Sequence, residues 1–133
     1  MSTLSYSAAT PLALENQETY GYSQAVRFGN ALYISGQGGW RPDGSIEVDN
    51  AAQIALAFQN VDQALISAGG NGLTDVFKVT TFLAPFTDEL AVLVSDEIKR
   101  RLPHKPLWTC IGVDKLAFPG MVCEVEIIAG LVD

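Results

Sequence analysis

The clearest periodic pattern in the chain is a run of apolar residues spaced by three and four positions between residues 50 and 68. Ile54, Phe58, Val61 and Leu65 fall at these spacings. On a helix they form one continuous apolar stripe. The pattern therefore predicts an amphipathic helix that packs on a core through this stripe.

Capping chemistry marks the ends of two helices. Asn50 with Gln53 resembles a capping box at the start of the first helix, and the glycine-rich run at 69–72 ends it. Thr87 is a favourable N-cap for a second helix, which ends with the basic residues 99–101. Cations suit the carbonyl end of a helix, so we interpret this basic run as helix-terminus chemistry rather than as a ligand site.

Runs rich in β-branched and aromatic residues predict the strands. Two short runs flank the pair Gly29-Asn30, a two-residue link typical of a β-hairpin. With the helices, the predicted order along the chain is ββαβαββ. The strands are expected at residues 24–28, 31–35, 76–83, 107–113 and 121–131.

This order predicts an α+β two-layer sandwich, in which a mixed sheet carries two helices on one face. We expect a single domain over residues 1–133, since the length suits one core. Residues 1–19 show no sustained periodicity and are interpreted as a loose N-terminal arm. The sheet face without helices is expected to be polar or to meet another subunit.

The last predicted strand separates its residues onto two faces. Cys123, Val125 and Ile127 alternate with Glu124 and Glu126. The apolar set is expected under the helices. The two carboxylates are then either ordinary surface glutamates or part of a cleft between subunits. In such a cleft, apolar walls would raise the pKa of a carboxylate and make it a general base.

Composition restricts the partners and the cellular compartment. Eight Lys and Arg against fifteen Asp and Glu give a net charge of −7, which argues against nucleic acid as a partner. No apolar run reaches the ~18–20 residues of a membrane span, and the first twenty residues contain no Lys or Arg, so we expect a cytoplasmic protein without a membrane partner. Charged residues are 17% of the chain, below the roughly 25% of typical soluble domains, which favours a surface covered by another subunit.

Metal chemistry has little support in the sequence. There is one histidine, His104, and the two cysteines, Cys110 and Cys123, lie in apolar surroundings without metal-ligand spacing. We expect no metal site. Cys110 is interpreted as a packing residue rather than a nucleophile, because no cationic neighbour is evident to lower its pKa.

Several motifs occur together and in a characteristic order. They are Tyr22-Ser-Gln-Ala-Val, Ile34-Ser-Gly-Gln37, and the segments 75–83 and 122–129. Together they resemble the reactive intermediate deaminase family (Rid, YjgF-type) over about residues 21–129. The resemblance implies a chorismate-mutase-like fold and a homotrimer with clefts between neighbouring subunits. It also implies hydrolysis of reactive enamine or imine intermediates without a cofactor.

The resemblance further implies the residues of a site. Glu124 matches the glutamate that orients the attacking water. Trp108 stands where deaminating members carry an arginine that grips the substrate carboxylate; tryptophan offers one N–H and a large π face instead of a fork of donors. Arg27 or Arg41 could replace that anchor from a new position, but the sequence does not place either guanidinium in the cleft. The residues expected to bind substrate are Tyr22, Ser35, Gly36, Trp108, Thr109 and Cys110.

Two functions remain open from the sequence. The first is hydrolytic deamination of an enamine or imine to a carbonyl compound and ammonia, with a small-molecule substrate larger or more aromatic than small 2-imino acids. The alternative is a non-catalytic trimer that binds a small molecule in the same clefts. Nuclease activity is disfavoured by the negative charge and by the lack of a histidine or carboxylate–metal constellation. Trp108 also has a purely structural interpretation as core or interface filler.

Overall fold

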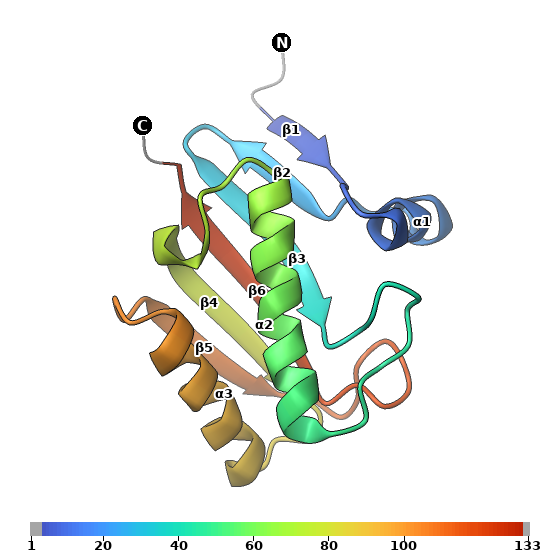
Figure 1. The fold of residues 1–133 in the computed structure, drawn as a ribbon, viewed down its shortest axis with the longest axis vertical. Coiled ribbons are helices and arrows are strands. Elements are labelled where there is room, and N and C mark those ends of the chain that lie inside the picture. Colours follow the sequence, from blue (N-terminus) through green and yellow to red (C-terminus); the bar gives the residue numbers. More distant parts are fainter. Residues whose placement is uncertain (1–3, 132–133) are drawn as a thin grey trace.

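A computed structural model of the chain describes residues 4–131. Six strands form one sheet in the order β1-β2-β3-β6-β4-β5 (Figure 1). Only the β4–β5 pair is parallel; the other neighbours are antiparallel. The strands are β1 (Leu4–Ser7), β2 (Ala25–Phe28), β3 (Ala31–Gly38), β4 (Val76–Leu83), β5 (Leu107–Gly112) and β6 (Cys123–Gly130).

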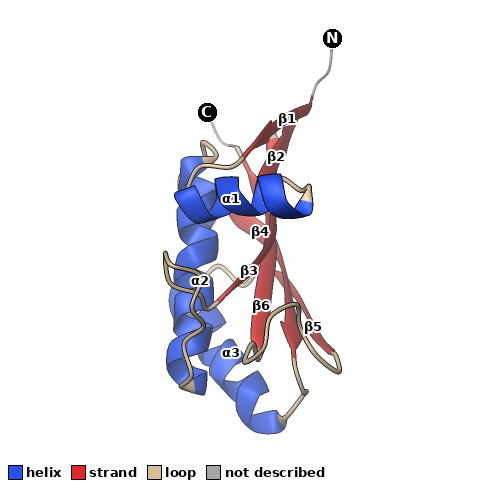
Figure 2. Cartoon of the chain, turned by 90° about the vertical axis from the view of Figure 1, so that its right-hand side faces the viewer, coloured by secondary structure: helices blue, strands red, loops and turns tan. Residues whose placement is uncertain are grey.

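Two long helices cover one face of this sheet (Figure 2). They are α2 (Asn50–Ser67) and α3 (Asp88–Arg101), with a short 3₁₀ turn, η1 (Leu73–Asp75), before β4. The apolar stripe of α2 is fully buried against the sheet, as its spacing predicted. The α+β two-layer arrangement is therefore confirmed, and ββαβαββ describes the chain from β2 to β6.

The N-terminal segment is not a loose arm. Leu4–Ser7 pairs with β2 as β1, and a further helix, α1 (Pro11–Tyr20), lies at that edge of the sheet (Figure 1). Thr10 caps this helix and Gly21, in a left-handed conformation, closes it. No residue of α1 is buried, so the helix has no apolar stripe that a periodicity argument could detect. Residues 1–3 of the expected arm lie outside the described part.

The expected capping box of α2 is also wrong by one position. Asp49, not Asn50, is the N-cap, and its carboxylate accepts from the backbone N–H of Ala52 at 2.9 Å. Asp and Asn are both favourable N-caps, and here they are neighbours in the sequence. The path of the preceding loop therefore decides which of the two caps the helix.

Gln53, the other member of the expected box, is fully buried instead of capping the helix. Its Nε2 donates to the carbonyls of Glu47 and Gly120 at 2.8 and 2.9 Å. Its Oε1 accepts from the N–H of Val122 at 2.7 Å. One side chain thus ties α2 to the loop before it and to the segment that leads into β6.

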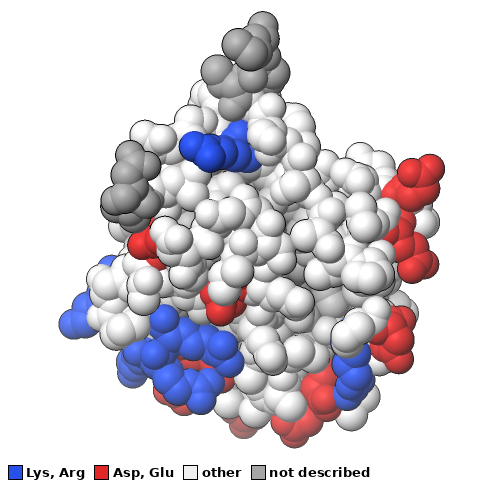
Figure 3. Space-filling model, turned by 45° about the horizontal axis from the view of Figure 1, so that its top comes forward, with Lys and Arg blue, Asp and Glu red and all other residues white. Residues whose placement is uncertain are grey.

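Helix α3 begins and ends as predicted. Thr87 caps it by accepting from the N–H of Leu90 at 3.1 Å. In its last turn, Arg100 and Arg101 both pair with Glu97 of the same helix. Basic side chains gather over this end of the molecule at the lower left of Figure 3.

None of the helices within residues 4–131 is long and apolar enough to cross a membrane.

The other face of the sheet has no helix over it (Figure 2). Alternation along β6 buries Cys123, Val125 and Ile127 under the helices, as predicted, and leaves Glu124 half-buried and Glu126 exposed on the uncovered side. We call this uncovered side the open face. Large side chains that are exposed on it are Tyr6, Phe28, Tyr33, Leu107 and Ile111. The open face is therefore substantially apolar rather than polar.

Candidate functional site

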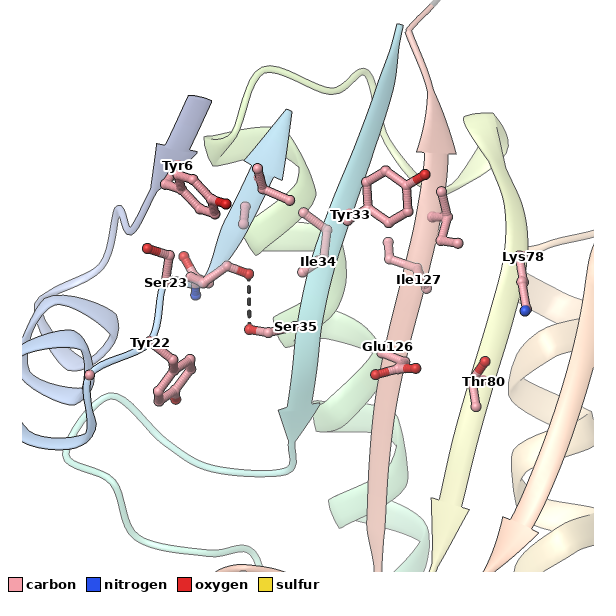
Figure 4. Close-up of a pocket in the computed structure, with 15 residues that line it drawn as sticks. Tyr6, Tyr22, Ser23, Tyr33, Ile34, Ser35, Lys78, Thr80, Glu126 and Ile127 are labelled. Atoms are coloured by element: carbon pink, nitrogen blue, oxygen red, sulfur yellow. Dashed lines mark hydrogen bonds between the residues drawn. The ribbon is translucent and has the colours of Figure 1, made fainter. Parts of the chain in front are cut away.

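The open face is hollowed over β2, β3, β6 and β4, as Figure 4 shows. The hollow has a volume of about 650 Å³. Tyr22 and Ser35, both predicted site residues, line it. So do Tyr33, Lys78 and Glu126, which the sequence argument did not assign to substrate binding.

Glu124 lies directly against Gly36. Strand β3 is irregular between Ile34 and Gln37, so Gly36 lies within a bulge opposite β6. A methyl group at Gly36 would lie 1.9 Å from Oε1 of Glu124. The carboxylate therefore occupies space that exists only because residue 36 has no side chain.

The environment of Glu124 changes its acidity. Partial burial raises the pKa of this carboxyl group above its ordinary value, and the negative charge of Glu126, two residues along β6, raises it further. Burial likewise raises the pKa of Tyr22, with a contribution from the charge of Glu124. A carboxylate with a raised pKa is a stronger base than an exposed one, so Glu124 is suited to take a proton from water.

Ser35 is fixed by the segment that precedes β2. Its Oγ donates to the carbonyl of Gln24 at 2.9 Å (Figure 4), and its backbone N–H donates to the same oxygen at 2.9 Å. These two bonds hold the start of β2, which follows Tyr22, next to the bulge in β3. Tyr22, Ser35, Gly36 and Glu124 therefore belong to one cluster within a single chain.

The predicted residues of β5 lie elsewhere. In the β4–β5 register Trp108 is paired with Val79 and Cys110 with Thr81, so both project to the helix-covered side. The indole Nε1 of Trp108 donates to Oγ1 of Thr81 at 3.0 Å, and its side chain remains 37% exposed. Cys110 packs against the core, as its structural interpretation predicted.

Thr109 projects to the open face, because it is paired with Thr80, which lines the hollow. Trp108 and Glu124 are nevertheless on opposite sides of the sheet. One chain therefore does not bring these two side chains together.

Neither arginine considered as a replacement anchor lines the hollow. Arg27 donates from Nε to the carbonyl of Gly29 within the β2–β3 hairpin, at 3.1 Å. Arg41 pairs with Glu47 in the loop after β3. The cation that does line the hollow is Lys78. Lys78 alternates with the buried Val79 and Thr81 and therefore lies on the open face, whereas the register shift between Val76 and Lys78 affects only the start of β4.

The described residues include no group of three or more His, Cys, Asp or Glu side chains arranged to hold a metal ion. Both cysteines are unbridged. Burial raises the pKa of the Cys123 thiol to about 12, so it stays protonated and unreactive at neutral pH. His104 is exposed, with Nε2 2.7 Å from the carbonyl oxygen of Val76.

Comparison with known proteins gives a consistent set of relatives. The family model described as endoribonuclease L-PSP matches residues 14–131. The RutC family protein YjgH of Escherichia coli is 38% identical over 110 residues, which cover 81% of each chain. The 2-iminobutanoate/2-iminopropanoate deaminase of Dermatophagoides farinae is 37% identical over 123 residues, covering 90% of this chain and 91% of that protein.

A solved structure agrees in fold over nearly the whole length. RidA from the Antarctic bacterium Psychrobacter sp. superposes with a TM-score of 0.77 at 27% sequence identity. The match covers 98% of this chain and 100% of that one. The region from β1 to β6 is thus shared as one unit, including the N-terminal strand and helix.

Proposed function

The chain belongs to the reactive intermediate deaminase (Rid, YjgF-type) family, and from this premise we propose that it hydrolyses a reactive enamine or imine to a carbonyl compound and ammonia. The observation that carries the proposal is the carboxylate of Glu124, which lies against Gly36 with a raised pKa. The relative from D. farinae, named as an imine deaminase, supports the same class of reaction.

In the proposed reaction Glu124 takes a proton from a water molecule. At the same time the oxygen of that water bonds to the carbon of a protonated C=N group. The C=N π electrons move to nitrogen, which gives a carbinolamine. A proton then passes to the nitrogen, the C–N bond breaks with its electrons leaving on ammonia, and the hydroxyl becomes the carbonyl after losing its proton. Water and imine are consumed, and a carbonyl compound and ammonia are formed. One base in the right position is sufficient for this sequence.

We propose that the site is completed in a homotrimer. Glu124, Gly36, Ser35 and Tyr22 form one half of it. The second half would come from β5 of a neighbouring copy, where Trp108 remains partly exposed and the backbone of Thr109 and Cys110 lies beside it. The exposed apolar residues of the open face supply a reason for copies to associate.

Trp108 determines the proposed substrate class. An arginine would bind a carboxylate through two charge-assisted hydrogen bonds, whereas the indole offers a flat apolar surface. We therefore propose an imine or enamine larger or more aromatic than a small 2-imino acid. An aromatic imine such as the one derived from phenylalanine is a suitable test compound, with the alanine-derived imine as the small comparison.

The test follows imine decay and ammonia release with both imines, generated in place by an amino-acid oxidase. We expect wild-type protein to accelerate hydrolysis of the aromatic imine, Glu124→Gln to abolish the acceleration, and Glu126→Gln to retain most of it. Glutamine keeps the size of the side chain but cannot accept a proton at neutral pH. Full activity in Glu124→Gln would contradict the assigned role.

Trp108→Arg tests the Trp108 half of the site independently of the Glu124 half. This variant is expected to gain hydrolysis of the alanine-derived imine, while Glu124→Gln/Trp108→Arg is expected to lose it again. If wild type and both single variants bind the aromatic compound but none turns it over, the protein is a binding module that uses the same clefts.

A further inference from the structure

A second cavity lies on the helix-covered side of the sheet, away from Glu124. It is enclosed by the start of α1, the loop that follows β3, and the middle of α2, and has a volume of about 300 Å³. Its apolar walls include Pro11, Trp40, Pro42 and Ala64. The surface between α1 and α2 carries few charged groups (Figure 3).

Two buried glutamines line this cavity and each holds the backbone with one end only. Gln24 is 8% exposed, and its Oε1 accepts from the N–H of Ala9 at 3.4 Å. Gln37 is 4% exposed, and its Nε2 donates to the carbonyl of Ser35 at 3.1 Å. These contacts fix which end of each carboxamide is nitrogen and which is oxygen.

The other ends of both glutamines are free within residues 4–131. No hydrogen bond is made by Nε2 of Gln24 or by Oε1 of Gln37 among the described residues. The one side-chain atom in that part of the chain that is both fully buried and unpaired is Oδ1 of Asp62. The free ends of the two glutamines are therefore not fully buried, and both side chains line this cavity.

Asn60 of α2 adds a third oriented amide. Its Nδ2 donates to the carbonyls of Gly38 and Trp40, both at 2.8 Å, so its Oδ1 is the end left over. The lining thus includes an unpaired amide donor of Gln24, amide acceptors of Gln37 and Asn60, and the exposed amide of Gln63. Arg41, which also lines it, is already paired with Glu47 and presents no unbalanced charge.

We propose that this cavity is a second small-molecule site, which takes a neutral planar ligand bearing a C=O acceptor and an N–H donor, such as an aromatic or cyclic amide. The donor and the acceptors have no partner in the described part of the chain, and such a ligand would satisfy them together while it displaces water. The faces of Trp40 and the two prolines suit a flat ring. A neutral ligand suits the cavity because Arg41, the charged residue of its lining, is paired with Glu47 outside it.

Benzamide is the probe, and its binding is followed by NMR through the indole N–H signals of the two tryptophans. Trp108→Phe assigns the signals. We expect the Trp40 signal to shift saturably, with a dissociation constant of roughly 1 mM, as is common for a fragment of this size, and the Trp108 signal to stay in place. Benzoate has the same ring but no N–H donor and a full charge, so it is expected to bind at least about tenfold more weakly.

Two variants test the cavity itself. Gln24→Met keeps the length of the side chain and removes the free donor, at the cost of only one long hydrogen bond; it is expected to weaken benzamide binding about tenfold. Ala64→Leu fills the cavity from α2 and is expected to abolish binding. Gln59→Met, an exposed change on the same helix, is the matched control and should bind as wild type does.

Circular dichroism and thermal unfolding establish that each variant is folded, and Gln24→Met alone suffices for the conclusion if Ala64→Leu does not fold. A Trp40 signal that does not move at 10 mM benzamide, about ten times the expected constant, would overturn the proposal and indicate a cavity filled by water only. Binding that Gln24→Met leaves unchanged would overturn it equally. Because the readout needs no turnover, the result is independent of the proposed hydrolase activity.

Discussion

Glu124 and Gly36 share a volume that two ordinary side chains could not occupy. The carboxylate lies over the glycine, where partial burial and the charge of Glu126 both favour its protonated form. A position that disfavours the charged state of a carboxylate costs stability at neutral pH, which is a common feature of functional groups. Both the chemistry and the cost of this arrangement can be measured on single substitutions.

The pH dependence of stability should show how much free energy of unfolding is lost when Glu124 is ionised. Its folded pKa is raised above the ordinary value of 4.5, so its contribution to stability is complete below that value and is lost as the pH rises through the folded pKa. We expect Glu124→Gln to have a higher melting temperature than wild type at pH 7. The difference should shrink towards zero as the pH falls below 4.5. A difference that does not change between pH 4 and pH 7, read by calorimetry, would contradict the raised pKa.

Gly36→Ala should separate activity from stability. The added methyl would lie 1.9 Å from a carboxylate oxygen and 2.8 Å from Cγ of Glu124, so the whole side chain would have to turn away. We expect the free energy of unfolding to fall by less than about 1 kcal/mol, and imine hydrolysis to fall by at least about a hundredfold because the base is displaced by an ångström or more. Gly130→Ala is the control on β6, since a methyl there meets nothing within 4 Å. If Gly36→Ala keeps its rate, the contact between residues 36 and 124 is unrelated to the reaction.

The helices and strands differ in how far their sequence determines them. Helix α2 has a buried stripe and α3 has charges matched to both ends, so both could be predicted from pattern and capping alone. Helix α1 buries nothing, and only its ends mark it, through the cap Thr10 with Pro11 after it and through Gly21. The register shifts in β3 and β4 could not be predicted for a different reason. A bulge depends on the partner strand, and the local sequence pattern contains no information about that strand.

The candidate site shows the same division. Glu124 could be placed on the open face because alternation in β6 is regular. Alternation with the buried Val79 and Thr81 also places Lys78 on this face, but the pattern could not show that the face is hollowed beside it. The pairing of Trp108 with Thr81 could not be foreseen either, because it joins residues on two strands whose register the sequence does not specify.

Gln53 connects three segments, and its loss should be costly. Gln53→Leu would leave two carbonyls and one N–H without their buried partner. An unpaired buried group costs about 1–3 kcal/mol, and these three groups belong to partly buried or exposed residues, so we expect the free energy of unfolding to fall by about 1–3 kcal/mol in urea denaturation. Gln59→Leu, an exposed change on the same helix, should alter it by less than about 0.5 kcal/mol. Equal effects of the two changes would show that the three hydrogen bonds contribute nothing net.

The whole molecule presents two different sides. The helix side has a packed core beneath it and charged ends, whereas the open face exposes Tyr6, Phe28 and Tyr33 around a large hollow. Exposed apolar area of this kind is typical of a subunit interface. The same association would supply β5 of one copy to the Glu124 half of another, so assembly and activity should be lost together.

Sedimentation should therefore give about three times the chain mass of 14.3 kDa at micromolar concentration. Interfaces of permanent oligomers commonly bury more than about 2,000 Å², so no exchange with monomer is expected at that concentration. Tyr33→Asp places a charge in the middle of the open face, where its desolvation in an interface would be unfavourable, and we expect it to yield monomers that are folded by circular dichroism but inactive. Val92→Asp makes the same kind of change at an exposed position of α3, on the opposite side of the sheet, and should leave the trimer intact. A Tyr33→Asp protein that sediments as wild type does would show that the open face is not where copies meet, and the second half of the site would then have to be sought on another surface.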